Sequence, residues 1–153
     1  MRPLNSRVKG DVVDSLGDTT GGFVNKGFAA TRESLRVLAV DDDDVNLRLI
    51  RRMLEKLDHS VRPVASGSEG LKLFREEPFD LVVTDLTMPE MSGDAIAIEM
   101  KAINPGIPII MLTGHSDIMD AGGGKPDAVD CVLGKPISMD AISRAIASVI
   151  VGT

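Results

Sequence analysis

Residues Arg36 to Asp44 read RVLAVDDDD, a short apolar run that ends in four consecutive aspartates. The run lacks the alternation of apolar and polar residues that marks a strand with one face in water, so it predicts a strand covered on both faces. Such strands are typical of parallel sheets that carry helices on each side. The aspartates come where this strand should end, at the edge of the sheet where open α/β proteins bind their ligands.

The same pattern recurs along the chain. After a first strand at Arg36–Val40, four more are predicted at Val61–Ala65, Asp80–Thr84, Ile107–Leu112 and Val129–Leu133. Helices are predicted at Asp44–Leu57, Ser66–Glu76, Ser92–Ile103 and Ser138–Val151. This alternation predicts an α/β fold with a doubly wound, five-stranded parallel sheet.

Finer expectations concern the helices and the turns beside them. In the first helix, Asp44 is the predicted N-cap, and the predicted buried stripe is Val45, Leu49, Met53 and Leu57. His59 is predicted to lie at the surface or in a turn. Residues 122–126 read GGGKP, which disfavours a helix interior, so the fourth helix is predicted to be short or irregular. We expect residues 114–126 to be the most mobile part of the domain.

Composition and charge narrow the class of protein. The chain has 153 residues, of which 43% are hydrophobic, as expected for one globular domain. Residues 1–35 contain five glycines without sustained periodicity, which predicts a flexible N-terminal arm or linker before a domain at 36–153. Five basic and four acidic residues give the arm a charge of +1. Since the net charge of the whole chain is −6, residues 36–153 carry a charge of −7. This acidity argues against nucleic acid or an anionic membrane as the partner.

Cysteine content and hydropathy bear on the compartment. A single cysteine excludes an internal disulfide and fits a reducing environment. No apolar run is long enough to cross a bilayer, and no signal peptide is visible at the N-terminus. A cytoplasmic location is therefore predicted.

Polar residues follow four of the five predicted strands, and they should meet at one edge of the sheet. These residues are Asp41, Asp42, Asp85, Thr113 and Lys135. Three carboxylates at close range repel one another, so a cation is expected among them, and Mg²⁺ prefers such oxygen ligands. A carboxylate set among Mg²⁺, an ammonium group and a hydroxyl could attack phosphorus and form an aspartyl phosphate.

Taken together, these motifs resemble the receiver domain of bacterial two-component response regulators. The matching segments lie within residues 36–150 and are, in order, Val40-Asp41-Asp42, Thr84-Asp85-Leu86-Thr87-Met88-Pro89, Leu112-Thr113-Gly114 and Gly134-Lys135-Pro136. The resemblance implies a flavodoxin-like strand order. It also implies phosphorylation by a histidine kinase or a histidine phosphotransfer protein, and output through an unidentified downstream protein.

The resemblance implies a role for each acidic residue. Asp85 would accept the phosphoryl group and also bind Mg²⁺. Asp42 would bind the metal directly, and Asp41 would bind it through water. The backbone carbonyl of Thr87 would complete the set of protein ligands.

Two further roles and one departure come from the same resemblance. Thr113 would be the switch hydroxyl, and Lys135 would form an ion pair with the phosphoryl group. The peptide bond to Pro136 is expected to be cis. Val132 stands where receivers usually carry Tyr or Phe, so the way in which the switch operates is left open.

Three interpretations of the function are open. The preferred one is a phosphoacceptor signalling domain that catalyses at most its own phosphorylation and dephosphorylation. A second is a protein-binding module that acts without phosphorylation, which Val132 and the interrupted fourth helix would favour. The third is the excised receiver of a hybrid histidine kinase. Because the last predicted helix ends close to Thr153, no effector domain is expected to follow.

Overall fold

The computed structural model describes residues 34–114 and 125–151 of the chain. Nearly all of the predicted arm lies outside these residues. The same is true of His115, of the predicted short fourth helix and of most of the segment expected to be mobile. Among the described residues, no helix combines the length and the apolar character that a membrane span requires.

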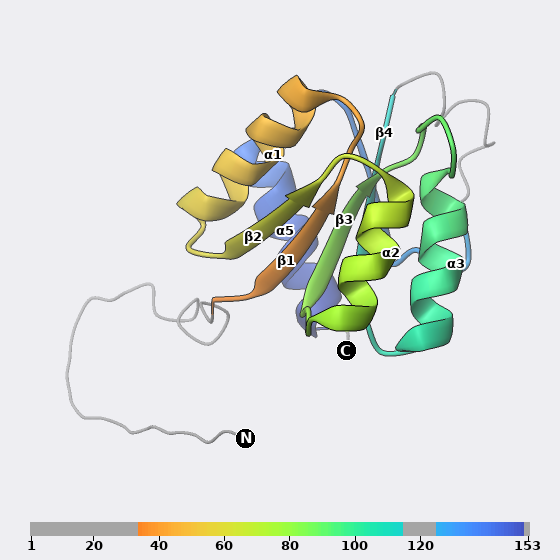
Figure 1. Ribbon diagram of the computed structural model, residues 1–153. Coiled ribbons are helices and arrows are strands. Elements are labelled where there is room, and N and C mark those ends of the chain that lie inside the picture. Colours follow the sequence, from red (N-terminus) through yellow and green to blue (C-terminus); the bar gives the residue numbers. More distant parts are fainter. Residues whose placement is uncertain (1–33, 115–124, 152–153) are drawn as a thin grey trace, which may run out of the picture. The chain divides into compact units, whose positions relative to one another are not determined.

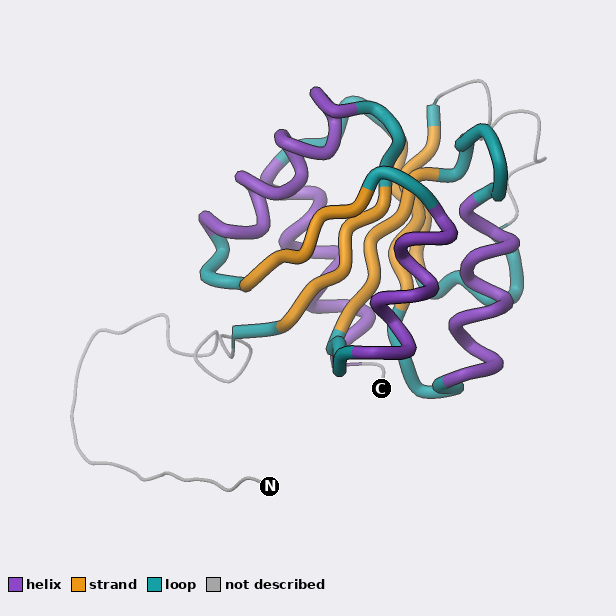
Figure 2. The backbone as a smooth tube through the Cα atoms, in the orientation of Figure 1, coloured by secondary structure: helices purple, strands orange, loops and turns teal. Residues whose placement is uncertain are grey.

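Five parallel strands form the central sheet (Figures 1 and 2). They are β1 (Arg36–Val40), β2 (Ser60–Val64), β3 (Leu81–Asp85), β4 (Ile109–Thr113) and β5 (Cys131–Gly134). Their order across the sheet is β2-β1-β3-β4-β5, which confirms the predicted doubly wound, flavodoxin-like topology. The ends of four strands differ from the predicted ones by one or two residues, so Asp85 and Thr113 are the last residues of their strands.

Helices cover both faces of this sheet within the described ranges, which explains why the central strands β1, β3 and β4 are mostly apolar. Helices α1 (Asp44–Lys56) and α5 (Met139–Val151) lie on one face, and α2 (Gly67–Glu76) and α3 (Gly93–Ile103) lie on the other (Figure 1). In β1, Val37 and Ala39 pack toward α1 and α5, whereas Leu38 and Val40 pack toward α2 and α3. A strand buried in this way needs apolar residues at every position.

Helix α1 buries a different stripe from the predicted one. Its buried and partly buried apolar residues are Leu47, Ile50, Met53 and Leu54. Val45 and Leu49 are 68% and 44% exposed, so the prediction was wrong at these two positions. A strict spacing of four residues drifts around a helix that has 3.6 residues per turn, and the core selects the alternating spacing of three and four.

Polar side chains near the amino ends of the strands pair with one another or with backbone N–H groups. Glu77 forms ion pairs with Arg36 and Arg62, with N–O distances of 3.2 and 3.0 Å. The Oδ2 atom of Asp80 accepts the backbone N–H of Arg36 at 2.9 Å. His59 is only 9% exposed, so it does not lie at the surface; it lies in the short connection between α1 and β2, in keeping with the alternative prediction of a turn. Its Nδ1 atom accepts the backbone N–H of Leu35 at 3.0 Å, and the start of the domain therefore covers the ring.

Strand β2 is an edge of the sheet as far as the structure describes the chain. The N–H of Ser60 and the carbonyl of Val64 both bond toward β1. Since backbone groups alternate along a parallel strand, the nitrogens of Val61 and Pro63 face away from the sheet. Pro63 has no N–H, so this edge lacks one of its donors.

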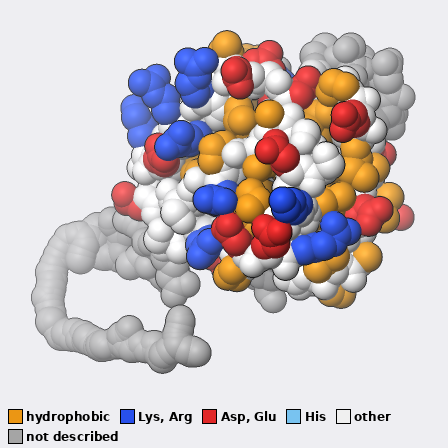
Figure 3. Space-filling view, viewed as in Figure 1, with side chains coloured by type: hydrophobic (Ala, Val, Ile, Leu, Met, Phe, Trp, Pro, Cys, Tyr) orange, Lys and Arg blue, Asp and Glu red, His pale blue; other side chains and the backbone are white. Residues whose placement is uncertain are grey.

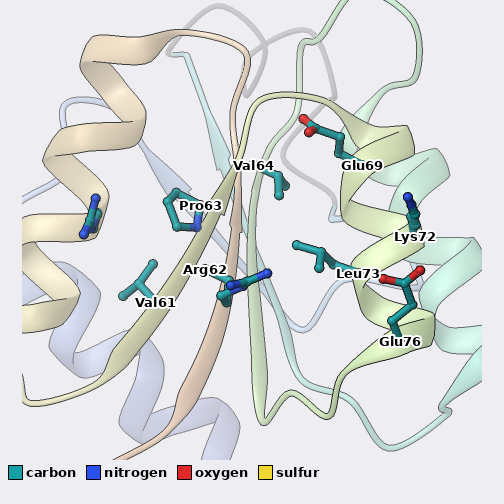
Figure 4. Close-up of a pocket in the computed structure, with 9 residues that line it drawn as sticks. Val61, Arg62, Pro63, Val64, Glu69, Lys72, Leu73 and Glu76 are labelled. Carbon is teal, nitrogen blue, oxygen red and sulfur yellow. The ribbon is translucent and has the colours of Figure 1, made fainter.

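An open hollow of about 600 Å³ runs along the β2 edge between α1 and α2 (Figure 4). The residues that line it are Arg51, Val61, Arg62, Pro63, Val64, Glu69, Lys72, Leu73 and Glu76. None of the residues predicted to form the phosphoryl site is among them, so this hollow is separate from the acidic edge of the sheet.

Candidate functional site

The carboxyl end of the sheet receives one polar side chain from each of four strands. Asp41 directly follows β1, Asp85 ends β3, Thr113 ends β4, and Lys135 directly follows β5. The strand register brings them level, because Asp85 lies opposite Leu112 and Thr113 lies opposite Gly134. The backbone N–H of Lys135 also donates to the carbonyl of Thr113 at 2.8 Å, which fixes the start of the Lys135 loop.

Lys135 is the link between the carboxylates. Its Nζ atom lies 2.5 Å from Oδ1 of Asp85 and 4.0 Å from Oδ2 of Asp41. The peptide bond that joins Lys135 to Pro136 is cis, as predicted. Asp41, Asp85 and Lys135 thus lie together at the carboxyl end of the sheet, as predicted from their positions after the strands.

Three carboxylates gather around this ion pair. Carboxylate oxygens of Asp41, Asp42 and Asp85 all lie within 4.8 Å of one another. Asp41 and Asp85 are 2% and 5% exposed, while Asp42 is exposed. This arrangement is a candidate cation site with an inner, buried side and an outer side that is open to water.

Burial and repulsion disturb the ionisation of Asp41. Burial raises its pKa to about 6, and the charges of Asp85 and Asp42 act in the same direction. The backbone N–H of Asp43 and the charge of Lys135 lower the pKa of Asp41, but they do not compensate fully. The three carboxylates thus hold more negative charge than the surrounding protein groups can stabilise.

For Lys135, unlike Asp41, the surroundings favour the charged form. Burial disfavours its charged form, but the hydrogen bond to Asp85 and the charges of Asp85, Asp41 and Asp43 outweigh that effect. The pKa of Lys135 is therefore raised, and the ammonium group stays charged at neutral pH.

Two buried polar atoms at this end of the sheet have no hydrogen-bond partner among the described residues. They are Oδ2 of Asp41 and Oγ1 of Thr113. Buried polar groups in native proteins are almost always satisfied, so exceptions call for an explanation. Oδ2 of Asp41, an acceptor without a hydrogen-bond donor, suits a bound cation. Oγ1 of Thr113, a hydroxyl without an acceptor, suits a bound oxyanion next to Lys135.

The loop after β3 is held close to the site. Thr87 lies in it, two residues beyond Asp85, and is exposed. The backbone N–H of Gly93 donates to the carbonyl of Leu86 at 2.8 Å, which closes the loop. A Cβ atom at Gly93 would lie 2.2 Å from the carbonyl oxygen of Asp85, so only glycine fits here.

The described donor set fits Mg²⁺. Hard divalent cations take oxygen ligands from one or two carboxylates and complete their shell with water and substrate oxygens. Asp42, Asp85 and the unsatisfied Oδ2 of Asp41 supply such oxygens. The positive charge of a cation would also relieve the repulsion that raises the pKa of Asp41.

The sequence analysis assigned the N-cap of α1 to the wrong aspartate, and it left the role of Val132 open. The N-cap of α1 is Asp43 and not Asp44, because the Oδ1 atom of Asp43 accepts the N–H groups of Val45 and Asn46. Aspartate suits an N-cap at either position, so residue type alone does not distinguish between them. Val132 lies in β5, half-buried against the core on the side of α2 and α3.

A flavodoxin-like sheet with a carboxylate cluster and a paired lysine at its carboxyl end defines a class of α/β domains with an acidic site at one edge of the sheet. The comparison with protein families narrows this class. The chain belongs to the response regulator receiver domain family, whose family model matches residues 37–147.

Individual relatives agree with this assignment. The chain is 40% identical over 110 residues to the transcriptional regulatory protein GlrR of Escherichia coli, a match that covers 72% of this chain and 25% of that protein. It is 36% identical over 120 residues to the virulence sensor protein BvgS of Bordetella pertussis, covering 74% of this chain and 10% of the sensor. The chain thus spans a quarter or less of the length of these two relatives.

A solved structure matches over nearly its whole length. The response regulator receiver domain protein from Clostridium thermocellum is 34% identical to this chain, with a TM-score of 0.70. The match covers 76% of this chain and 94% of the other. The shared unit is therefore the receiver domain itself.

Proposed function

We propose that this receiver domain accepts a phosphoryl group from a phosphohistidine donor onto Asp85, with Mg²⁺ bound, and signals through protein–protein contact. The observation that carries the proposal is the contact of 2.5 Å between Nζ of Lys135 and Oδ1 of Asp85, next to the unsatisfied hydroxyl of Thr113. A nucleophile, a fixed positive charge and a hydrogen-bond donor without a partner are the groups that phosphoryl transfer requires.

The proposed reaction is a single displacement at phosphorus. A carboxylate oxygen of Asp85 attacks, and an O–P bond forms. The P–N bond to the donor histidine breaks, and its electron pair stays on the imidazole nitrogen. Lys135 holds the carboxylate before attack and neutralises charge on the phosphoryl oxygens afterwards, while the hydroxyl of Thr113 donates a hydrogen bond to one of them.

The metal would be held by Asp42, by Asp85 and by the backbone carbonyl of Thr87, with Asp41 contributing through water. When bound, Mg²⁺ would neutralise negative charge on the transferring group. The close packing of Gly93 on the backbone of Asp85 keeps the nucleophile in place.

The exposed side of α1 is the surface that suits the phosphoryl donor. Val45 and Leu49 are exposed apolar side chains one turn apart, and they lie just beyond the acidic residues of the site. Arg48 and Arg52 are exposed on the same helix, and Figure 3 shows Lys and Arg side chains gathered over α1. An apolar pair flanked by positive charge fits a helical partner with acidic groups around an apolar patch.

The test is phosphorylation with a small donor such as acetyl phosphate. Wild-type protein with Mg²⁺ should gain one acid-labile, hydroxylamine-sensitive phosphoryl group. Asp85→Asn should abolish the labelling, and Lys135→Ala should retain Mg²⁺ but lose most of the labelling. Asp80→Asn is the matched control, because Asp80 directly precedes β3, at the opposite end of the strand from Asp85. Label that persists in Asp85→Asn would assign the acceptor to another residue.

A second function is favoured by Val132, which leaves the domain without the aromatic ring that the family resemblance led us to expect. In that case the domain binds its partner constitutively, and phosphorylation does not alter the affinity. Measuring partner binding with and without beryllofluoride, a mimic of the phosphoryl group, distinguishes the two functions.

The wider context of the domain stays a matter of proposal. GlrR is named as a transcriptional regulator and BvgS as a sensor, so this domain could act beside a DNA-binding module or within a hybrid kinase. The expected absence of a nucleic-acid partner, the N-terminal arm and the cytoplasmic location stay predictions.

A further inference from the structure

Asp43 is joined to the carboxyl end of the sheet through two separate groups. Its Oδ1 atom accepts the backbone N–H groups of Val45 and Asn46, at 2.9 and 3.1 Å, and so caps α1. Its own backbone N–H donates to Oδ1 of Asp41 at 2.9 Å. One residue therefore ties the first turn of a helix to a buried carboxylate of the site.

This double attachment determines which oxygen of Asp41 is available. The cap holds Asp43 in an extended conformation, with φ −92° and ψ 114°, which aims its N–H at Asp41. With Oδ1 occupied, Oδ2 is the atom that has no donor among the described residues, and it lies 4.0 Å from Nζ of Lys135. A metal ion or its water would satisfy that atom, and residues that orient such oxygens normally determine much of the affinity.

We propose that Asp43 is a positioning residue of the metal site, which acts through its helix cap and not through its charge. The inference rests on the proposed function, because it concerns the same site. The carboxylate of Asp43 is exposed, so solvent screens its attraction for a cation. Its capping bonds, in contrast, fix the turn that carries Asp41 and Asp42.

Asparagine separates these two contributions, because it caps a helix about as well as aspartate but carries no charge. Asp43→Asn should bind Mg²⁺ within about threefold of wild type, whereas Asp43→Ala should bind about tenfold more weakly. Asp43→Ser, which restores a capping oxygen, should recover most of the lost affinity. Ser66→Ala is the matched control, since it removes the cap bond from Ser66 to the N–H of Glu69 in α2, which has no link to the carboxylates.

Two measurements on the full chain decide the matter. Isothermal titration with Mg²⁺ gives the affinities, and hydrogen exchange of the residue 43 amide in metal-free protein reports its bond to Asp41. That amide should exchange faster in Asp43→Ala than in wild type, Asp43→Asn or Ser66→Ala. A general loss of stability would not produce this pattern, because the Ser66→Ala control also loses a cap.

The possible failures can be distinguished. If Asp43→Asn and Asp43→Ala weaken Mg²⁺ binding equally, charge is responsible and the inference is overturned. If Asp43→Ala binds as tightly as wild type, the cap does not position the site, and the proposed function stands. If wild-type protein binds no Mg²⁺, or if binding survives in Asp85→Asn, the proposed metal site itself is wrong, and the inference falls with it.

Discussion

The polar groups at the two ends of the sheet differ in whether they have hydrogen-bond partners. At the amino end, Glu77 pairs with two arginines, Asp80 accepts a backbone N–H, and His59 accepts another. At the carboxyl end, Asp41 and Thr113 each keep a buried oxygen without a hydrogen-bond partner in the described part of the chain. The amino end is arranged for stability, while the carboxyl end gives up stability for groups that can bind a ligand.

The largest expected effect comes from the carboxyl end. Gly93→Ala should destabilise the domain by about 3 kcal/mol, because the new Cβ would collide with the backbone of Asp85 and cannot be relieved by a side-chain movement. Urea unfolding measures this change. Gly106→Ala is the control, since its Cβ would meet only the side chain of Asn104 at 3.6 Å. Equal stability of the two variants would contradict the close packing inferred at Gly93.

Removing a charge should act in opposite directions at the two ends. In metal-free protein at pH 7, Asp41→Asn should stabilise the domain by about 2 kcal/mol, since it removes a buried carboxylate whose pKa is raised to about 6. Asp80→Asn should destabilise it, because the carboxylate of Asp80 accepts the N–H of Arg36 at the amino end. Thermal unfolding in the presence of EDTA compares them. Saturating Mg²⁺ should cancel the advantage of Asp41→Asn.

The two ends should also respond oppositely to pH in metal-free protein. Asp41 has a raised pKa, so between its ordinary value of 3.8 and about 6 the folded state binds more protons, and the free energy of unfolding falls as pH rises. Burial lowers the pKa of His59, against the weaker effect of Asp58. The folded state therefore binds fewer protons than the unfolded state below 6.5, and stability falls as pH falls.

Variants separate these two pH effects. Asp41→Asn should leave only the loss of stability toward low pH, and His59→Gln should leave only the gain. Both groups titrate within about pH 4 to pH 8. Urea unfolding over this range would show how the free energy of unfolding changes with pH in each variant. Identical slopes in the two variants would contradict the assignment of either group.

Two buried threonines offer a smaller contrast within the carboxyl end. The hydroxyl of Thr84 donates to the carbonyl of Asp85 at 3.0 Å, whereas that of Thr113 has no partner in the described residues. Thr113→Val should stabilise metal-free protein by about 1 kcal/mol, and Thr84→Val should destabilise it by about as much. Calorimetry of both variants tests the difference in sign. Thr113→Val should also weaken the response to beryllofluoride.

The smallest expected effect lies at the amino end. Glu77→Gln removes two ion pairs whose basic partners, Arg36 and Arg62, are about half exposed. Such pairs contribute little, so a loss of about 0.5 kcal/mol is expected, and it should vanish at high salt. A loss several times larger would mean that the pairs at this end are as important as the packing at Gly93.

The residues of the site could be predicted from the sequence because each follows or ends a strand. Parallel strands bring their carboxyl ends to one edge, so the apolar runs alone were sufficient to place Asp41, Asp85 and Lys135 together. The alternating spacing of α1, the choice of Asp43 as cap and the burial of His59 were beyond the sequence. Each depends on packing between distant segments, as when Leu35 covers a ring 24 residues later in the chain.

The proline in β2 affects how readily molecules of this protein aggregate through their sheet edges. An exposed strand edge can template the strand of another chain, and growth in that direction leads to aggregates. At the outward positions of β2, Pro63 supplies no N–H, and the neighbouring Arg62 is exposed and charged. A strand from a second molecule would lose a ladder bond and bury charge beside it, so this edge resists intermolecular sheet growth.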